Sequence, residues 1–160
     1  MNRRAALLVP LGLATCAAPA TLVETIDAGT MPFPVMPGLV VPDISLPPTQ
    51  PDRDEATALA RQALLRGIGE RPKADPAPDG ALLLQAQALG LPRVVRLTVV
   101  RADSVRSGLF GVTTVTAAIR MRVLEVRTGW VAGEATFRRT SRSAEDVAAA
   151  ITALAAGLLA

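Results

Sequence analysis

The chain has 160 residues, of which half are hydrophobic and only 2% are aromatic, and its formal net charge is +3. It contains no histidine and no tyrosine, and it has a single cysteine and a single lysine. These absences exclude an intrachain disulfide and remove most side chains used for metal binding, acid–base catalysis and base stacking. The length is sufficient for one domain with its own hydrophobic core.

An export signal is predicted at the amino terminus. Arg3 and Arg4 precede an apolar run over residues 5–14, and the only cysteine, Cys16, follows it. A segment of this length rises about 15 Å as a helix, which is half of the hydrocarbon core of a bilayer, so it can engage a translocon but cannot span. The pattern predicts a signal peptide over residues 1–15 that ends directly before a thiol.

The residues Leu13-Ala14-Thr15-Cys16 resemble the lipobox of bacterial lipoproteins. The resemblance implies that the leader is removed and that Cys16 carries acyl chains such as palmitate. Thr15 departs from the usual Gly, Ala or Ser. Ala17 resembles the signal for sorting to the outer membrane. Two alternatives are a soluble periplasmic form, cleaved after Ala18-Pro19-Ala20, and an unmodified, buried Cys16.

A proline-rich tether is predicted over residues 16–51. Eight prolines fall between residues 17 and 51, where they remove amide donors and favour extended backbone. One interruption, Leu39-Val40-Val41 with Ile44 beyond Pro42, is apolar enough to form an additional edge strand, where proline is tolerated. The folded domain is accordingly expected over residues 52–160.

Two helices are predicted after the tether. The first covers residues 53–68, with Asp52 as its cap and with Gly67 and Gly69 closing it, and the second begins with Asp79 as its cap and extends to Leu89. Both are amphipathic and therefore need a surface to cover. The apolar face of the first is formed by Ala56, Leu59, Ala60, Ala63, Leu64 and Ile68.

Three strands, over residues 93–103, 113–126 and 130–140, are predicted to form an antiparallel meander because their connections are short. The second alternates between two sides, and its apolar side carries Val115, Ala117, Ile119, Met121 and Val123.

A last helix is predicted to begin at the Ser143-x-x-Asp146 cap and to dock on this sheet. The apolar stripe of this helix consists of Val147, Ile151, Leu154 and Leu158. The resulting fold class is α+β: an antiparallel three- to four-stranded sheet with helices packed on one face, after a cleaved signal peptide and a Pro-rich tether.

Residues 53–160 resemble a broad group of small Gram-negative envelope lipoproteins, which includes the curli-secretion lipoprotein and the lipoprotein activators of penicillin-binding proteins. The resemblance rests on the terminal helix and on two further features: the Ala86-x-x-Leu89-Gly90 helix leading into Val94-Val95-Arg96-Leu97, and the long strand ending in Val126-Arg127-Thr128-Gly129-Trp130. It implies an assembly or regulatory role in the cell envelope and names no partner.

Charge is distributed unevenly along the chain. Residues 17–92 have five cations and nine acids, whereas residues 93–142 have ten arginines and three acids. Alternation places four arginines on the solvent face of the sheet, with threonines beside them, and this face is a candidate binding site for phospholipid headgroups, lipopolysaccharide phosphates or an acidic protein. The alternative is an ordinary solvated sheet face. The arginines are Arg96, Arg120, Arg122 and Arg138.

Two large apolar residues, Leu109 and Phe110, lie between glycines in the loop over residues 107–111. They are candidates for contact with a partner or a membrane; the alternative, which we favour, is that they fold back over the core edge. Trp130, beside a turn, also has two interpretations. It could contact a partner or a membrane, or it could cover the open edge of the sheet.

No catalytic site is expected. Without histidine, the available bases are carboxylates and Lys73, and Lys73 lies in a proline-rich turn. We expect no enzyme activity, no metal, no cofactor and no nucleic-acid partner. Two hypotheses remain: an outer-membrane-anchored lipoprotein that acts as a non-catalytic binding or assembly module, and a structural or self-associating soluble periplasmic protein.

Overall fold

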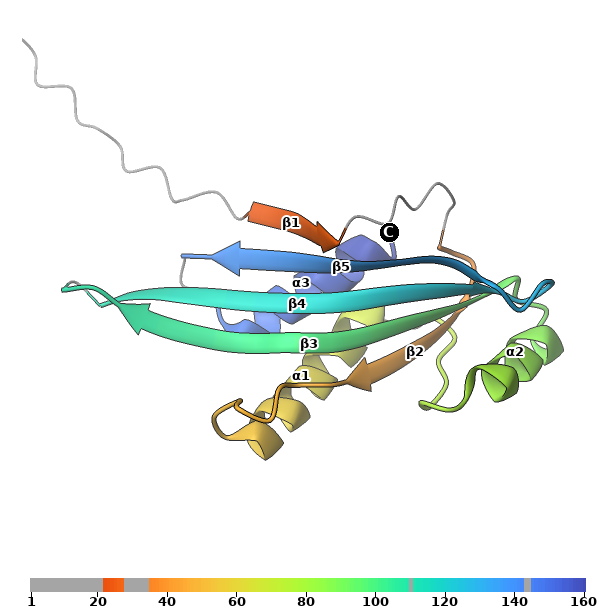
Figure 1. Ribbon diagram of the computed structural model, residues 1–160, viewed down its shortest axis with the longest axis horizontal. Helices are drawn as coiled ribbons and strands as arrows, with labels where there is room; N and C mark the ends of the chain where they lie inside the picture. Colours follow the sequence, from red (N-terminus) through yellow and green to blue (C-terminus); the bar gives the residue numbers. More distant parts are fainter. Residues whose placement is uncertain (1–21, 28–34, 110, 143–144) are drawn as a thin grey trace, which may run out of the picture.

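The computed structural model describes residues 22–27, 35–109, 111–142 and 145–160. These residues form one sheet of five strands, in the order β1-β5-β4-β3-β2, together with three helices (Figure 1). The fold is α+β, as the sequence predicts. The elements in chain order are β1 (Leu22–Asp27), β2 (Leu39–Ile44), α1 (Arg53–Ile68), α2 (Asp79–Ala88), β3 (Arg93–Ser107), β4 (Val112–Glu125), β5 (Val131–Ser141) and α3 (Val147–Leu158).

The predicted meander of three antiparallel strands is present as β3, β4 and β5. The additional edge strand expected near Val40 is β2, but it pairs parallel to β3, so the sheet is mixed. A parallel pair cannot be joined by a tight turn, and the connection from β2 to β3 accordingly contains both α1 and α2.

The folded domain begins earlier than the predicted boundary at residue 52. Both β1 and β2 fall within residues 16–51, and β1 pairs antiparallel to β5, with Leu22 opposite Thr140. Prolines flank residues 22–27 without interrupting them, so this stretch can form ladder hydrogen bonds. The proline-rich segment therefore contains two strands of the sheet in addition to connecting residues.

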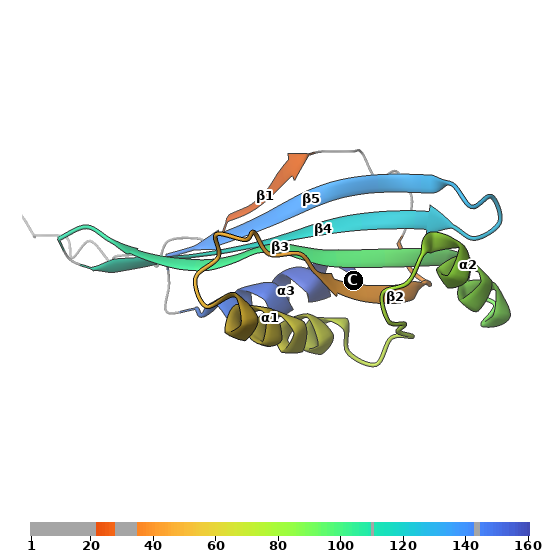
Figure 2. The ribbon, with the colours of Figure 1, turned by 60° about the horizontal axis from the view of Figure 1, so that its bottom comes forward.

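The main core lies between one face of the sheet and the two longer helices. The five apolar residues predicted on one side of β4 are each at most 2% exposed, and they pack in one cluster with residues of α1 and α3. Figure 2 shows these helices side by side beneath the sheet. The buried residues of α3 are Ala150, Ile151, Leu154 and Ala155, so its buried stripe contains more alanine than predicted.

Helix α2 contributes to a second, smaller core. Its buried Leu82 and Ala86 pack with Leu39, Val41, Val94 and Leu124, which alternate with the residues of the main core. The predicted packing of helices on one face therefore holds for α1 and α3, whereas α2 covers the end of the opposite face, where β3 begins.

The predicted caps of α1 and α2 differ from the structure, and α3 begins at Val147, later than the Ser143-x-x-Asp146 cap predicts. Asp52 has a φ of 46° and its side chain makes no capping hydrogen bond to α1, although this helix has the predicted bounds. Asp79 is the first residue of α2, and Pro78 takes the cap position. Asp146 does cap α3 by accepting from the Ala149 amide at 2.7 Å, while Ser143 lies outside the described residues.

Across the described ranges, no helix has the length and apolar character needed to cross a bilayer.

The contact between α1 and α3 depends on a residue without a side chain. A Cβ atom on Gly67 would lie 2.6 Å from the carbonyl oxygen of Thr152 and 2.7 Å from the Cβ of Ala155. The helices are also joined by the Thr152 hydroxyl, which donates to the carbonyl of Ala63 at 3.0 Å. Because the nearest atoms include backbone, a side chain at residue 67 would push the helices apart.

We expect Gly67→Ala to lower the free energy of unfolding by about 1–3 kcal/mol, the range typical of overpacking in a core. Gly157→Ala is the matched control, because a Cβ added to this exposed helical glycine would meet no atom within 4 Å. The control should raise stability by about 0.5–1 kcal/mol through helix propensity. Chemical denaturation measures both, and equal effects of the two changes would contradict the close α1–α3 contact.

Candidate functional site

The four arginines predicted to form a binding face lie on the side of the sheet opposite α1 and α3. Arg96 of β3 is opposite Arg122 of β4, and Arg120 of β4 is opposite Thr136 of β5. Arg138 shares this face because it lies two residues after Thr136 on the same strand. Like charges directly opposite one another destabilise an antiparallel pair, so Arg96 and Arg122 require an anion close by.

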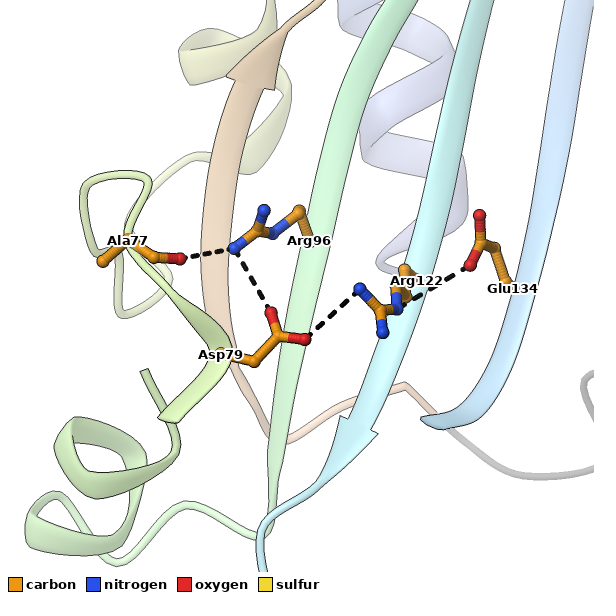
Figure 3. A network of polar contacts seen from close by, with 5 residues as sticks. All are labelled: Ala77, Asp79, Arg96, Arg122 and Glu134. Carbon is orange, nitrogen blue, oxygen red and sulfur yellow. Dashed lines mark hydrogen bonds and ion pairs between the residues drawn. The ribbon is translucent and has the colours of Figure 1, made fainter. Parts of the chain in front are cut away.

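Asp79 of α2 supplies that anion (Figure 3). Its Oδ1 atom lies 3.4 Å from Nη2 of Arg96 and its Oδ2 atom lies 3.2 Å from Nη1 of Arg122. Nη2 of Arg96 also donates to the carbonyl of Ala77 at 2.6 Å. The residue predicted to cap α2 instead joins this helix to the sheet, a role that no local sequence pattern reveals.

Glu134 of β5 is the second carboxylate of the face. Its Oε2 atom lies 3.7 Å from Nε of Arg122, and its Oε1 atom lies 4.0 Å from Nε of Arg120. Glu134 is directly opposite Arg122 in the register. The alternation of side chains along β5 predicts that this acid shares the face of the arginines. The face is therefore a network of paired charges.

A hollow of about 250 Å³ opens on this network. Its lining contains three arginines and two carboxylates, with hydroxyl groups between them, and Asp79 borders it through its ion pairs with Arg96 and Arg122. Three cations thus face three anions, which leaves no excess positive charge to attract an anion from a distance. The lining residues are Asp43, Ser45, Arg96, Thr98, Arg120, Arg122 and Glu134.

Arg120 is the arginine of this face least occupied by other groups of the described residues. The Arg120 side chain is 53% exposed, and its ion pair with Glu134 is at the 4.0 Å limit. Nε of Arg138 is buried and has no hydrogen-bond partner in the structure of the described residues. Of the predicted face, Arg120 is therefore the side chain most available for contact with an anionic group, whereas Arg138 is half-buried and lies directly opposite Glu24 of β1 in the register.

In the loop between β3 and β4, Leu109 does not fold back over the core. Leu109 is fully exposed at the tip of this loop, so the interpretation that Leu109 covers the core edge is wrong. Phe110 lies outside the described residues. Trp130 is 77% exposed beside the turn between β4 and β5, so it does not cover the sheet edge either.

Among the described residues, the main side chains that could serve as a catalytic base or as metal ligands are Lys73 and the carboxylates. Lys73 is exposed, and its ammonium donates to the carbonyl of Gly69. In the parts of the chain that the structure describes, no three His, Cys, Asp or Glu residues lie together as a metal site would require. Of the predicted contact residues, the structure describes the arginine face and the exposed Leu109.

No protein-family model matches the chain, and no curated protein sequence matches it. Two crystal structures of the PelC dodecamer from Paraburkholderia phytofirmans share its fold, each with a TM-score of 0.51. Their identities to this chain are 19% and 22%; each covers 88% of this chain, and the matches extend over 95% and 96% of the PelC chains. The lipoprotein GNA1162 from Neisseria meningitidis is also similar, with a TM-score of 0.38, 15% identity, and coverage of 74% of this chain and 95% of its own.

Replacing Asp79 tests the charge network. We expect Asp79→Ala to lower the free energy of unfolding by about 0.5–2 kcal/mol, because two partly exposed arginines lose their shared carboxylate. The loss should shrink at high salt, which screens the remaining repulsion. Asp75→Ala is the control, since Asp75 is exposed in the same connection. Chemical denaturation at two salt concentrations measures the effect; equal losses for both variants would contradict the network.

Proposed function

We propose that the chain is an exported lipoprotein, anchored in the outer membrane through Cys16, that acts as a non-catalytic binding or assembly module of the cell envelope. The observation that carries this proposal is the position of the only cysteine. It follows an apolar leader and precedes the first residue of β1 by six residues. A domain that starts so close to an acylated residue is held against the membrane surface.

The contact surfaces of this module are the arginine face and the tip of the β3–β4 hairpin. On the arginine face, we assign Arg120 and Arg138 to an anionic group of a partner because neither has an ion pair with Asp79, whereas Arg96 and Arg122 hold α2 in place through that carboxylate. On the hairpin, Leu109 and Phe110 are the proposed contact residues. This division gives two arginines a structural role and two a binding role.

Acylation of Cys16 tests the proposal. We expect the mature wild-type chain to begin at a diacylated Cys16 and to partition with membranes, whereas Cys16→Ser should keep its leader and gain no lipid. Thr15→Ala is the matched control, because it restores the usual lipobox residue and should leave acylation intact or make it faster. Mass spectrometry of the amino terminus measures the result. A mature chain that begins with a free Thr21 would support the soluble periplasmic alternative instead.

Self-association is a second candidate function, favoured by the fold that the chain shares with a protein that forms dodecamers. The chain offers a suitable surface at the α2 end of the sheet. Leu84, Leu89, Trp130 and Val131 are exposed there, and Gly129 in the turn lies next to Leu83 of α2. Exposed apolar patches of this kind are typical of interfaces between subunits.

If copies assemble through this end, the double change Leu89→Gln with Trp130→Gln should convert the assembly to monomers, because it removes two apolar anchors. Leu109→Gln at the opposite end should leave the assembly intact. Native mass spectrometry of the detergent-solubilised chain counts the copies. A wild-type chain that is monomeric at all concentrations would remove this candidate function and would leave lipid anchoring untouched.

A further inference from the structure

The β3–β4 hairpin projects beyond the rest of the sheet. Ile44, the last residue of β2, is opposite Val99, and Ser141, the last residue of β5, is opposite Val115. The pairs from Val105–Thr114 outward therefore belong to β3 and β4 alone. In both ribbon views this two-stranded end extends past α1 and α3 (Figures 1 and 2).

Three apolar side chains are exposed among the described residues of the projecting end, which carries one charge and also presents the hydroxyl groups of Ser107 and Thr113. Leu109 is fully exposed, and Val105 and Val112 are about half exposed. Arg106 is the single charged residue between residues 104 and 115, and its Nε donates to the carbonyl of Gly111 at 3.2 Å, which keeps the guanidinium at the tip. Exposed apolar side chains beside one cation are suited to binding a lipid bilayer. The aliphatic groups can be buried at the boundary between headgroups and acyl chains, and the arginine can pair with anionic headgroups.

The chain leading to Cys16 leaves the domain at the same end. Leu22 is the first residue of β1 and lies in one row across the sheet with a residue of each of the next three strands. These residues are Thr140 of β5, Thr116 of β4 and Asp103 of β3. Cys16 lies six residues before Leu22, so the Cα atom of Cys16 is at most about 20 Å from the Cα atom of Leu22. Leu109 lies six residues beyond Asp103, again about 20 Å along the strand direction.

We propose that the tip of the β3–β4 hairpin inserts Leu109 into the membrane leaflet that holds the acyl chains of Cys16. This inference rests on the lipid anchoring of the proposed function and adds a second point of membrane contact. The short connection keeps the tip near the leaflet, and the absence of acids between residues 104 and 115 removes repulsion by anionic headgroups. Two contacts at one end fix how the domain stands on the bilayer.

A single-cysteine fluorophore tests the contact. In the acylated full-length chain the sulfur of Cys16 is a thioether, so Leu109→Cys provides the only free thiol. An environment-sensitive dye on this residue is followed after reconstitution into vesicles of phosphatidylethanolamine and phosphatidylglycerol. Ala81→Cys, an exposed residue of α2 at the opposite end, is the matched control. We expect the dye at residue 109 to shift its emission to shorter wavelength and to be quenched by nitroxide lipids, and the dye at residue 81 to remain water-like.

Three other outcomes overturn the inference, and each has a different meaning. If both dyes are water-like while the protein floats with the vesicles, anchoring stands and the tip does not insert. If the dye at residue 109 shifts in detergent without vesicles and in proportion to protein concentration, the tip contacts a second copy instead. If the parent chain itself takes up dye at Cys16, the thiol is free and the proposed function fails as well.

Discussion

Both surfaces of the domain depend on the alternation of side chains along β4, the central strand of the sheet. Its apolar residues form the floor on which α1 and α3 pack, and the residues between them include Arg120 and Arg122. A slip of one residue in the pairing of β4 would bury these arginines under the helices and expose the core. The register is therefore set by the burial of one face, and the charged face is its consequence.

The same constraint explains why the arginine face is mostly neutral. The parallel pairing of β2 with β3 requires a crossover, and this crossover places α1 on one face and α2 over the end of the other. Asp79 at the start of α2 thereby reaches both Arg96 and Arg122. Desolvation of two arginines that face each other would otherwise be costly, so the fold supplies the carboxylate that these side chains need.

Sequence periodicity predicted the elements whose pattern is local. The bounds of α1 and the buried side of β4 match the structure because each follows from spacing within a single segment. Strand β1 was not predicted, since six residues between prolines carry a weak signal until β5 provides a partner. The role of Asp79 was also missed: its local pattern is that of a helix cap, and its actual partners lie 17 or more residues away.

The position of β1 changes what an acyl anchor at Cys16 would do. A proline-rich connection of about 35 residues, extended at about 3.1 Å per residue, spans about 110 Å, which leaves a small domain free to turn in any direction. Pairing of β1 with β5 reduces the connection to residues 17–21, so an acyl anchor at Cys16 would keep the end of the sheet where β1 begins near the bilayer. For a chain anchored in this way, the hairpin end is restricted to partners at the membrane, and the apolar patch at the α2 end points away from it. With Cys16 acylated as proposed, the hydrogen bonds of one short edge strand would decide which surface of the domain each class of partner can reach.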